Sequence, residues 1–117
     1  MITRVTIQQK EEMLYWKTRV EKVKEYVSEN LAGDLQITTV CKKFDLNKFT
    51  LDHIFKEQQK ETYREYVERM RMEKAFNLLK EGKWVKEVIP EIGYRNWGTF
   101  NIAFKKKYKY APSFFKK

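Results

Sequence analysis

The chain has 117 residues and carries 25 Lys and Arg side chains against 16 Asp and Glu, for a formal net charge of +9. This length suits one moderate domain, or two small subdomains that share a helix. The only cysteine, Cys41, excludes an intramolecular disulfide and a cysteine-based zinc site. With one histidine and no glycine-rich phosphate loop, the chain has no recognisable catalytic set. We therefore predict a protein that is not an enzyme and that has no cofactor or metal.

The positive charge is concentrated in the second half of the chain. Residues 1–60 carry 11 basic and 9 acidic side chains, whereas residues 61–117 carry 14 basic and 7 acidic. Such a surface suits a polyanion, although a basic charge also serves solubility. The N-terminus lacks the apolar run of a signal peptide, and no later run is long enough for a membrane span. We expect a cytoplasmic protein that does not enter a membrane.

The sparse glycines and prolines favour helices throughout the chain. Val20, Val23 and Val27 recur at helical spacing, and Gly33 is placed to end this helix in a left-handed conformation. The apolar residues 13–16 can extend the helix, pack back on the domain or form a partner surface. Of these alternatives we favour packing.

A short helix, a tight turn and a longer helix come next. We expect the short helix over residues 37–44, and Asn47 is a good N-cap for a helix over residues 48 to about 58. Thr62 and Glu65 then fit a capping box, in which each side chain bonds the backbone N–H of the other residue. The helix that they open has about 18 residues.

After a stop at Gly82, the same order repeats. A short helix is expected over residues 84–92, and Asn96 caps a final helix that runs to about Tyr108. Pro90 lies within the short helix and should kink or shorten it. A short helix, a tight turn and a long basic helix are the parts of a helix-turn-helix unit.

Three segments of the second half carry a more specific motif: RMRMEKAFNLLKEG, VKEVIPEIGYRNWGTFNIAFKKKY and APSFF. The stretch from about Arg19 to Lys117 resembles the DNA-binding domain of the AraC/XylS family of bacterial transcription regulators. The residues that match are Gly93, Tyr94, Phe100, Phe104, Lys105, Pro112, Ser113 and Phe115, with Arg71, Glu73, Ala75 and Leu79 in the linker helix. Departures from the family pattern are Pro90, Gln36 and Gly98, and lysines stand in place of turn glycines at positions 60 and 109.

The resemblance implies an all-α, homeodomain-like fold of about seven helices, in which two helix-turn-helix subdomains are joined by a long linker helix. We divide the chain into an N-terminal extension of unknown role (1–18), a first helix-turn-helix subdomain (19–60), the linker helix (61–81) and a second subdomain (82–117). A linker of this length spans about 27 Å. With its flanking turns it can place two recognition helices about 34 Å apart, in successive major grooves. A monomer would then suffice, if the chain stands alone.

The resemblance also implies which side chains face DNA. The candidates for base contact are Phe49, His53, Trp97, Asn101 and Ile102. The candidates for phosphate contact are Lys48, Lys56, Arg95, Lys105, Lys106 and Lys107. Asn101 has the chemistry to bond adenine, whereas Ile102 offers only apolar contact. Asp52 occupies a groove-facing position, and we interpret it as a solvated surface acid, because a carboxylate repels phosphate.

The sequence therefore predicts a sequence-specific regulator of transcription whose partner is double-stranded DNA. RNA polymerase or another regulator is an additional candidate partner. Two alternatives keep the fold: a protein-interaction module that has lost DNA reading, and a non-specific DNA-binding protein that needs only the lysines.

Overall fold

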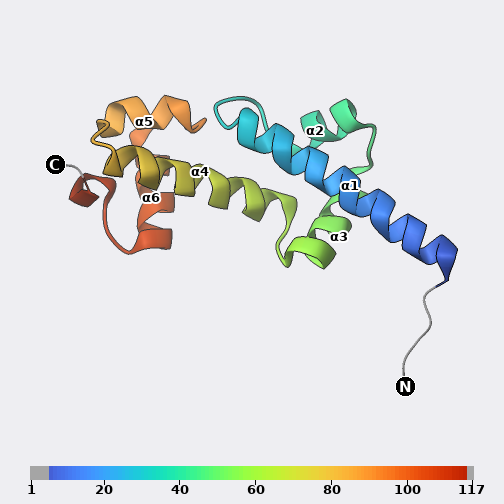
Figure 1. Cartoon of the computed structure of the whole chain (residues 1–117). Helices are drawn as coiled ribbons and strands as arrows, with labels where there is room; N and C mark the ends of the chain where they lie inside the picture. Colours follow the sequence, from blue (N-terminus) through green and yellow to red (C-terminus); the bar gives the residue numbers. More distant parts are fainter. Residues whose placement is uncertain (1–5, 116–117) are drawn as a thin grey trace, which may run out of the picture.

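The computed structural model describes residues 6–115 of the chain (Figure 1). These residues form six α-helices and one 3-10 helix, with no strand among them. The elements in chain order are α1 (Ile7–Glu29), α2 (Ile37–Phe44), α3 (Lys48–Gln59), α4 (Tyr63–Lys80), α5 (Val85–Glu91), α6 (Trp97–Tyr108) and the 3-10 helix η1 (Pro112–Phe115). The prediction of an all-α fold is confirmed. Residues 1–5 of the expected N-terminal extension lie outside the described residues.

The helices begin where the sequence places their capping residues. The side chain of Asn47 accepts from the backbone N–H of Phe49 at 2.8 Å, and Asn96 caps α6 in the same way. At the start of α4, the Thr62 hydroxyl accepts from the backbone N–H of Glu65 at 3.1 Å. The Glu65 carboxylate accepts from the backbone N–H of Thr62 at 2.8 Å. Because these bonds satisfy N–H groups that a helix start leaves unpaired, they fix where each helix begins.

Three helix ends bear on positions where the sequence or the family pattern has a turn residue. Lys60 and Lys109, which stand in place of turn glycines, have left-handed backbones, with φ of 62° and 71°. Gly33 does not take the left-handed conformation that we predicted for it. The helix α1 ends earlier, at the cap residue Asn30, whose side-chain amide donates to the Tyr26 carbonyl at 2.8 Å. Since asparagine ends the helix by this local bond, no left-handed glycine is needed.

Pro90 lies in the last turn of α5, one residue before the helix ends. Its ring nitrogen cannot donate to the Lys86 carbonyl, which is the normal acceptor four residues earlier. The ladder resumes beyond it, where the backbone N–H of Ile92 donates to the Val88 carbonyl at 3.2 Å. The helix covers Val85–Glu91, one residue less at each end than the range of about 84–92 expected from the sequence.

The helices enclose two separate hydrophobic clusters that share α4. The first lies among α1, α2, α3 and the start of α4, and the second among the rest of α4, α5, α6 and η1. The first half of α4 gives Tyr63, Tyr66 and Val67 to the first cluster, and the second half gives Met72, Ala75 and Leu79 to the second. We call these two bodies the first head and the second head. Figure 1 shows them on either side, with α4 running between them. The residue boundaries assigned from the sequence stay predictions.

The N-terminal half of α1 projects beyond the first cluster. Met13 is 63% exposed, and Leu14 and Tyr15 are also more than half exposed. These residues extend the first helix, and the expectation that they pack back on the domain is wrong for them. The reason is geometric: the buried stripe of α1 begins only at Val20, and residues 13–15 lie more than a turn before it.

Candidate nucleic-acid interface

The helix α3 presents its outer face because its inner face is anchored in the core. Leu51 and Phe55 are buried against the first cluster. Helical spacing places Phe49, His53 and Lys56 on the opposite side, where all three are exposed. Phe49 is 73% exposed, so its ring lies open on this face. These are three of the side chains that the sequence predicts to face DNA.

Two of the predicted contact residues of α3 make local interactions on its surface. The His53 Nε2 lies 3.1 Å from a carboxylate oxygen of Glu57, one turn later. The Lys48 ammonium lies 5.2 Å from the centre of the Phe49 ring. Both are exposed pairs, and such pairs contribute little to stability. His53 and Lys48 can therefore exchange these neighbours for DNA at small cost.

Asp52 is not the solvated surface acid that we predicted. It is half-buried, and its carboxylate accepts from the backbone N–H of Tyr63 at 3.1 Å. This N–H is one of the first in α4, which has no acceptor within the helix. Asp52 thus ties the recognition helix to the linker helix. Sequence reasoning missed this role because the partner is a backbone group 11 residues away.

The helix α6 is anchored in the second head by Phe100 and Phe104, which are both fully buried. Of the predicted base-contact residues, Ile102 is 71% exposed and Trp97 is about half exposed. Asn101 is half-buried, and its side-chain oxygen is buried without a hydrogen-bond partner. Because an unpaired buried oxygen is costly, this amide gains by turning outward to a polar partner. Bidentate bonding to adenine would require such a rotation.

The lysines near the end of α6 do not share one environment. Lys106 and Lys107 line a depression of about 280 Å³ together with Glu65 and Glu68 of α4. Lys105 is exposed and does not line this depression. The acids of α4 offset part of the positive charge of this cluster. Of the three lysines, Lys105 is thus the one that lies outside the depression and its two acids.

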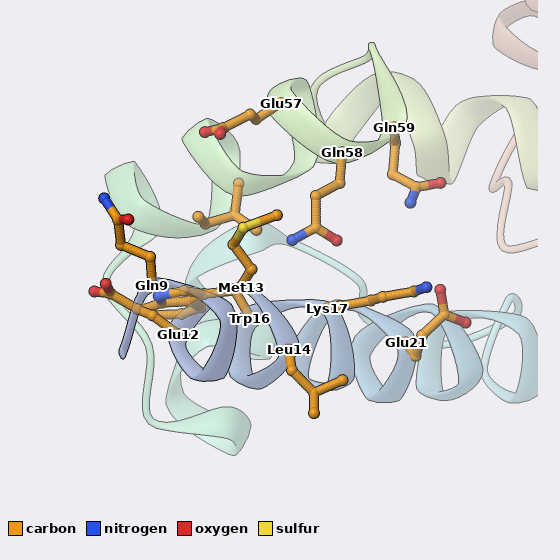
Figure 2. A pocket seen from close by; sticks show the side chains of 11 residues that line it. Gln9, Glu12, Met13, Leu14, Trp16, Lys17, Glu21, Glu57, Gln58 and Gln59 are labelled. Atoms are coloured by element: carbon orange, nitrogen blue, oxygen red, sulfur yellow. The ribbon is translucent and has the colours of Figure 1, made fainter. Parts of the chain in front are cut away.

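A second surface feature adjoins the outer face of α3, since Glu57, the partner of His53, also lines it. An open groove of about 790 Å³ runs between the N-terminal half of α1 and the end of α3. Figure 2 shows Met13 reaching from α1 toward Gln58 and its neighbours on α3. The residues that line it are Gln9, Glu12, Met13, Leu14, Trp16, Lys17, Glu21, Ile54, Glu57, Gln58 and Gln59. Three carboxylates and one ammonium stand on this mostly apolar groove. The run Met-Leu-Tyr-Trp at 13–16 was its signal in the sequence.

Neither a metal nor a membrane is indicated by the described part of the chain. Residues 6–115 contain no group of three His, Cys, Asp or Glu side chains that could hold a metal ion. Within the same range, no helix is both long and apolar enough to cross a bilayer.

Comparison with known proteins places this geometry in a family. A helix-turn-helix domain family matches residues 40–117. The Msm operon regulatory protein of Streptococcus mutans is 28% identical over 102 residues, which cover 86% of this chain and 37% of that protein. The chain spans less than two thirds of the length of the curated relatives that it matches.

Solved structures share the fold over most of the chain. The C-terminal domain of AraT, a response regulator of Geobacillus stearothermophilus, has a TM-score of 0.80 at 23% identity, with 84% of this chain and 83% of that one covered. The C-terminal domain of the two-component response regulator yesN of Fusobacterium nucleatum has a TM-score of 0.79 at 24% identity, with 86% and 99% covered. At these identities the likeness concerns the fold.

Proposed function

Because the chain belongs to the AraC-type family of helix-turn-helix DNA-binding domains, we propose that it regulates transcription by placing α3 and α6 in successive major grooves of double-stranded DNA. Membership confirms the resemblance seen in the sequence and the prediction that the chain is not an enzyme. The observation that carries the proposal is the pairing of two anchored helices, each with an exposed outer face, through one continuous linker helix. The site of action would be the bacterial cytoplasm, where the DNA lies.

The linker helix suits this mode of binding. The 18 residues of α4 span about 27 Å, and the flanking turns add to this span. Recognition helices that read successive major grooves on one face of DNA lie about 34 Å apart. One chain can therefore occupy two grooves, which supports the prediction that a monomer suffices for DNA binding.

We assign the base-contact roles to the side chains on the outer faces of the two recognition helices. In the first head, His53 would donate to a base and Phe49 would give apolar contact. In the second head, Asn101 would bond adenine, and Trp97 and Ile102 would pack against a thymine methyl group. The two faces thus offer different chemistry for reading bases.

The phosphate-contact roles belong to cations around the same faces. The proposed residues are Lys48 and Lys56 in the first head, and Arg95, Lys105, Lys106 and Lys107 in the second. All of these residues are exposed. Such contacts fix the position of the protein on DNA but do not choose its sequence.

Selection of bound sequences from a random duplex pool at near-physiological salt tests the proposal. We expect enrichment of two short sequence blocks about one helical turn apart. Binding without enrichment, with a steep loss of affinity as salt rises, would instead indicate a non-specific DNA-binding protein. No binding at micromolar protein would contradict any role in DNA binding. It would instead favour a protein-interaction module that keeps the fold.

Contact with RNA polymerase or another regulator would use the groove between α1 and α3. Its apolar wall, formed by Met13, Trp16 and Ile54, and its acidic rim suit an amphipathic helix with basic flanks. We expect Met13→Glu to abolish a transcriptional response and to leave DNA affinity unchanged. Thr18→Glu, an exposed position on the same helix outside the groove, is the matched control. A normal response from Met13→Glu would contradict this use of the groove.

A further inference from the structure

One arginine in the middle of the linker helix bonds to the first head across a long sequence separation. The Arg71 Nε donates to the Leu31 carbonyl at 3.1 Å. One of its terminal nitrogens donates to the Gly33 carbonyl at 3.0 Å. Both carbonyls belong to the segment between α1 and α2. The forked guanidinium can satisfy two such acceptors at once, which a lysine ammonium does less well.

The same carbonyl is also approached from the second head. Gly93, in the turn between α5 and α6, has a φ of +82°. A Cβ atom on this residue would lie 2.4 Å from the Leu31 carbonyl oxygen and 2.8 Å from a terminal nitrogen of Arg71. Both distances are far below normal contact. Only glycine allows the turn of the second head to come this close to the segment that follows α1. In Figure 1, the end of α5 lies beside the end of α1.

Electrostatic effects agree that the two heads meet here. Burial lowers the pKa of Arg71, and Tyr94 of the second head and Tyr63 of the first both act on this guanidinium. The pKa of Asp34 in the first head is lowered chiefly by a hydrogen bond from the backbone N–H of Gln36, with a smaller contribution from Arg95 of the second head. Charged groups of the two heads thus lie within reach of each other.

We propose that Arg71, the carbonyls of Leu31 and Gly33, and Gly93 form a clasp between the heads that sets the spacing of the DNA blocks they recognise. A single helix joins the two bodies at one place only. The clasp adds a second attachment beside the helix. Gly93 lies three residues before Asn96, the cap of α6, so the clasp fixes the start of this recognition helix relative to the first head.

The opposite face of α4 stiffens the same point of the helix. Arg69 pairs with Glu61 at 2.7 Å and with Glu73 at 3.0 Å. Residues 69 and 71 point to opposite sides of a helix, since two residues turn it by about 200°. The Arg69 pairs are local to α4 and the turn before it, whereas the Arg71 bonds reach the segment between α1 and α2. Arg71 is therefore the residue that positions the two heads relative to each other. Its effect would be on the distance between the DNA blocks that they recognise.

A distance measurement without DNA tests the clasp independently of the proposed function, on which the spacing role rests. Spin labels on cysteines at Lys42 of α2 and Lys86 of α5, both exposed, report the separation of the heads in a Cys41→Ala background. We expect one narrow distance distribution, which Arg71→Ala broadens or displaces. Lys74→Ala, an exposed position on the same helix, is the control and should leave it narrow. An unchanged distribution in Arg71→Ala would overturn the clasp.

Spacing preference in DNA is the second readout. The two selected blocks are moved apart by one base pair, which also turns the second block by about a tenth of a helical turn. We expect the wild type to lose about tenfold in affinity and Arg71→Ala to lose less than about threefold, with Arg71→Lys between them. A merely destabilised protein would weaken equally at every spacing. Equal spacing preference in wild type and Arg71→Ala would contradict the role, while absence of DNA binding by the wild type would contradict the proposed function alone.

Two glycines with the same backbone conformation separate the close approach from turn strain. Gly82 has a φ of +97° and no neighbour within 4 Å of an added Cβ, whereas Gly93 meets the clasp. Both Gly82→Ala and Gly93→Ala carry the strain of a left-handed alanine. We expect only Gly93→Ala to change the label distance and the spacing preference. Equal effects of the two substitutions would show that Gly93 acts only through its turn.

Discussion

The two heads share one fold but carry different side chains on the outer faces of α3 and α6. In the first head, the outer face of α3 carries a histidine and a phenylalanine, and its one acid, Asp52, is occupied by the backbone of α4. In the second head, the outer face of α6 carries an exposed isoleucine and a run of lysines, and its one amide, Asn101, has its oxygen buried. The first face is poorer in lysines, whereas on the second face the one amide would have to rotate outward to bond a base.

This difference teaches that a repeated fold need not mean a repeated function. The second half of the chain carries most of the net charge, which suits phosphate binding and the positioning of the protein. The heads are anchored alike, each through two buried side chains of its recognition helix. What differs is confined to the outer faces, where substitutions cost the fold little.

Removal of an anchor should have the largest effect and tests whether the heads are independent. Phe55→Ala and Phe104→Ala each delete a fully buried ring, one in each cluster, and each should cost about 3–5 kcal/mol in the free energy of unfolding. Denaturant unfolding gives the loss, and amide NMR spectra show where it falls. We expect the unmutated head to keep its native signals, because the clusters share only α4. Loss of the native signals of both heads in either variant would show that the heads do not fold independently.

Base reading should differ between the heads. Asn101→Ala should relax the preference at one base pair of the second block and cost about 1–3 kcal/mol there, because an amide can bond adenine twice. His53→Ala should cost less at the first block, since a histidine would give a single bond and already has Glu57 as a partner. Competition binding with singly substituted duplexes measures both. A larger loss from His53→Ala would reverse the assignment of roles.

Phosphate contacts should be stronger in the second head. Lys105→Gln should weaken binding to all sequences alike and reduce the slope of log affinity against log salt by about 0.9. Lys106→Gln should change the slope less, because Glu65 and Glu68 already lie beside Lys106. Titrations at several salt concentrations give the slopes, with Lys74→Gln as a surface control. Equal slopes for Lys105→Gln and Lys106→Gln would contradict the inequality among these lysines.

The smallest effect concerns the cap of the helix that both heads share. The backbone N–H of Thr62 and then its hydroxyl lower the pKa of Glu65 below its ordinary value of 4.5. The unfolded chain therefore binds this proton more readily than the folded chain. The stabilisation is complete above the unfolded pKa and is lost as the pH falls through the lower, folded pKa. Denaturant unfolding measured between pH 6 and pH 3 gives the free energy of unfolding at each pH. This free energy should fall slightly less with decreasing pH in Glu65→Gln than in the wild type. An identical pH dependence would show that the cap contributes nothing measurable.

Local patterns in the sequence were enough for the order of the helices from α2 onward and for the starts of α3, α4 and α6. The capping residues Asn47, Thr62 and Asn96 all cap as predicted, because a capping bond joins residues two or three positions apart. The buried faces of α3 and α6 also follow from spacing alone, since the helical period fixes which residues share a side. The candidate contact residues of α3 came instead from the resemblance to the AraC/XylS family. Whether they touch DNA is a prediction about a partner and awaits the experiments above.

Only the tertiary structure decided how distant parts of the chain meet. Asp52 bonds to the backbone of Tyr63, and Arg71 to carbonyls 38 and 40 residues earlier. Gly93 was identified in the sequence only as a match to the family pattern, and its approach to Leu31 was not foreseen. A periodic pattern says which side of a helix is apolar, but not which other helix will cover it or leave it open, as at Met13. The sequence by itself determined two anchored helix-turn-helix heads and their link, because those depend on short-range bonds and helical period. Their contact, and with it the relative placement of the two recognition helices, depends on packing between residues far apart in the chain.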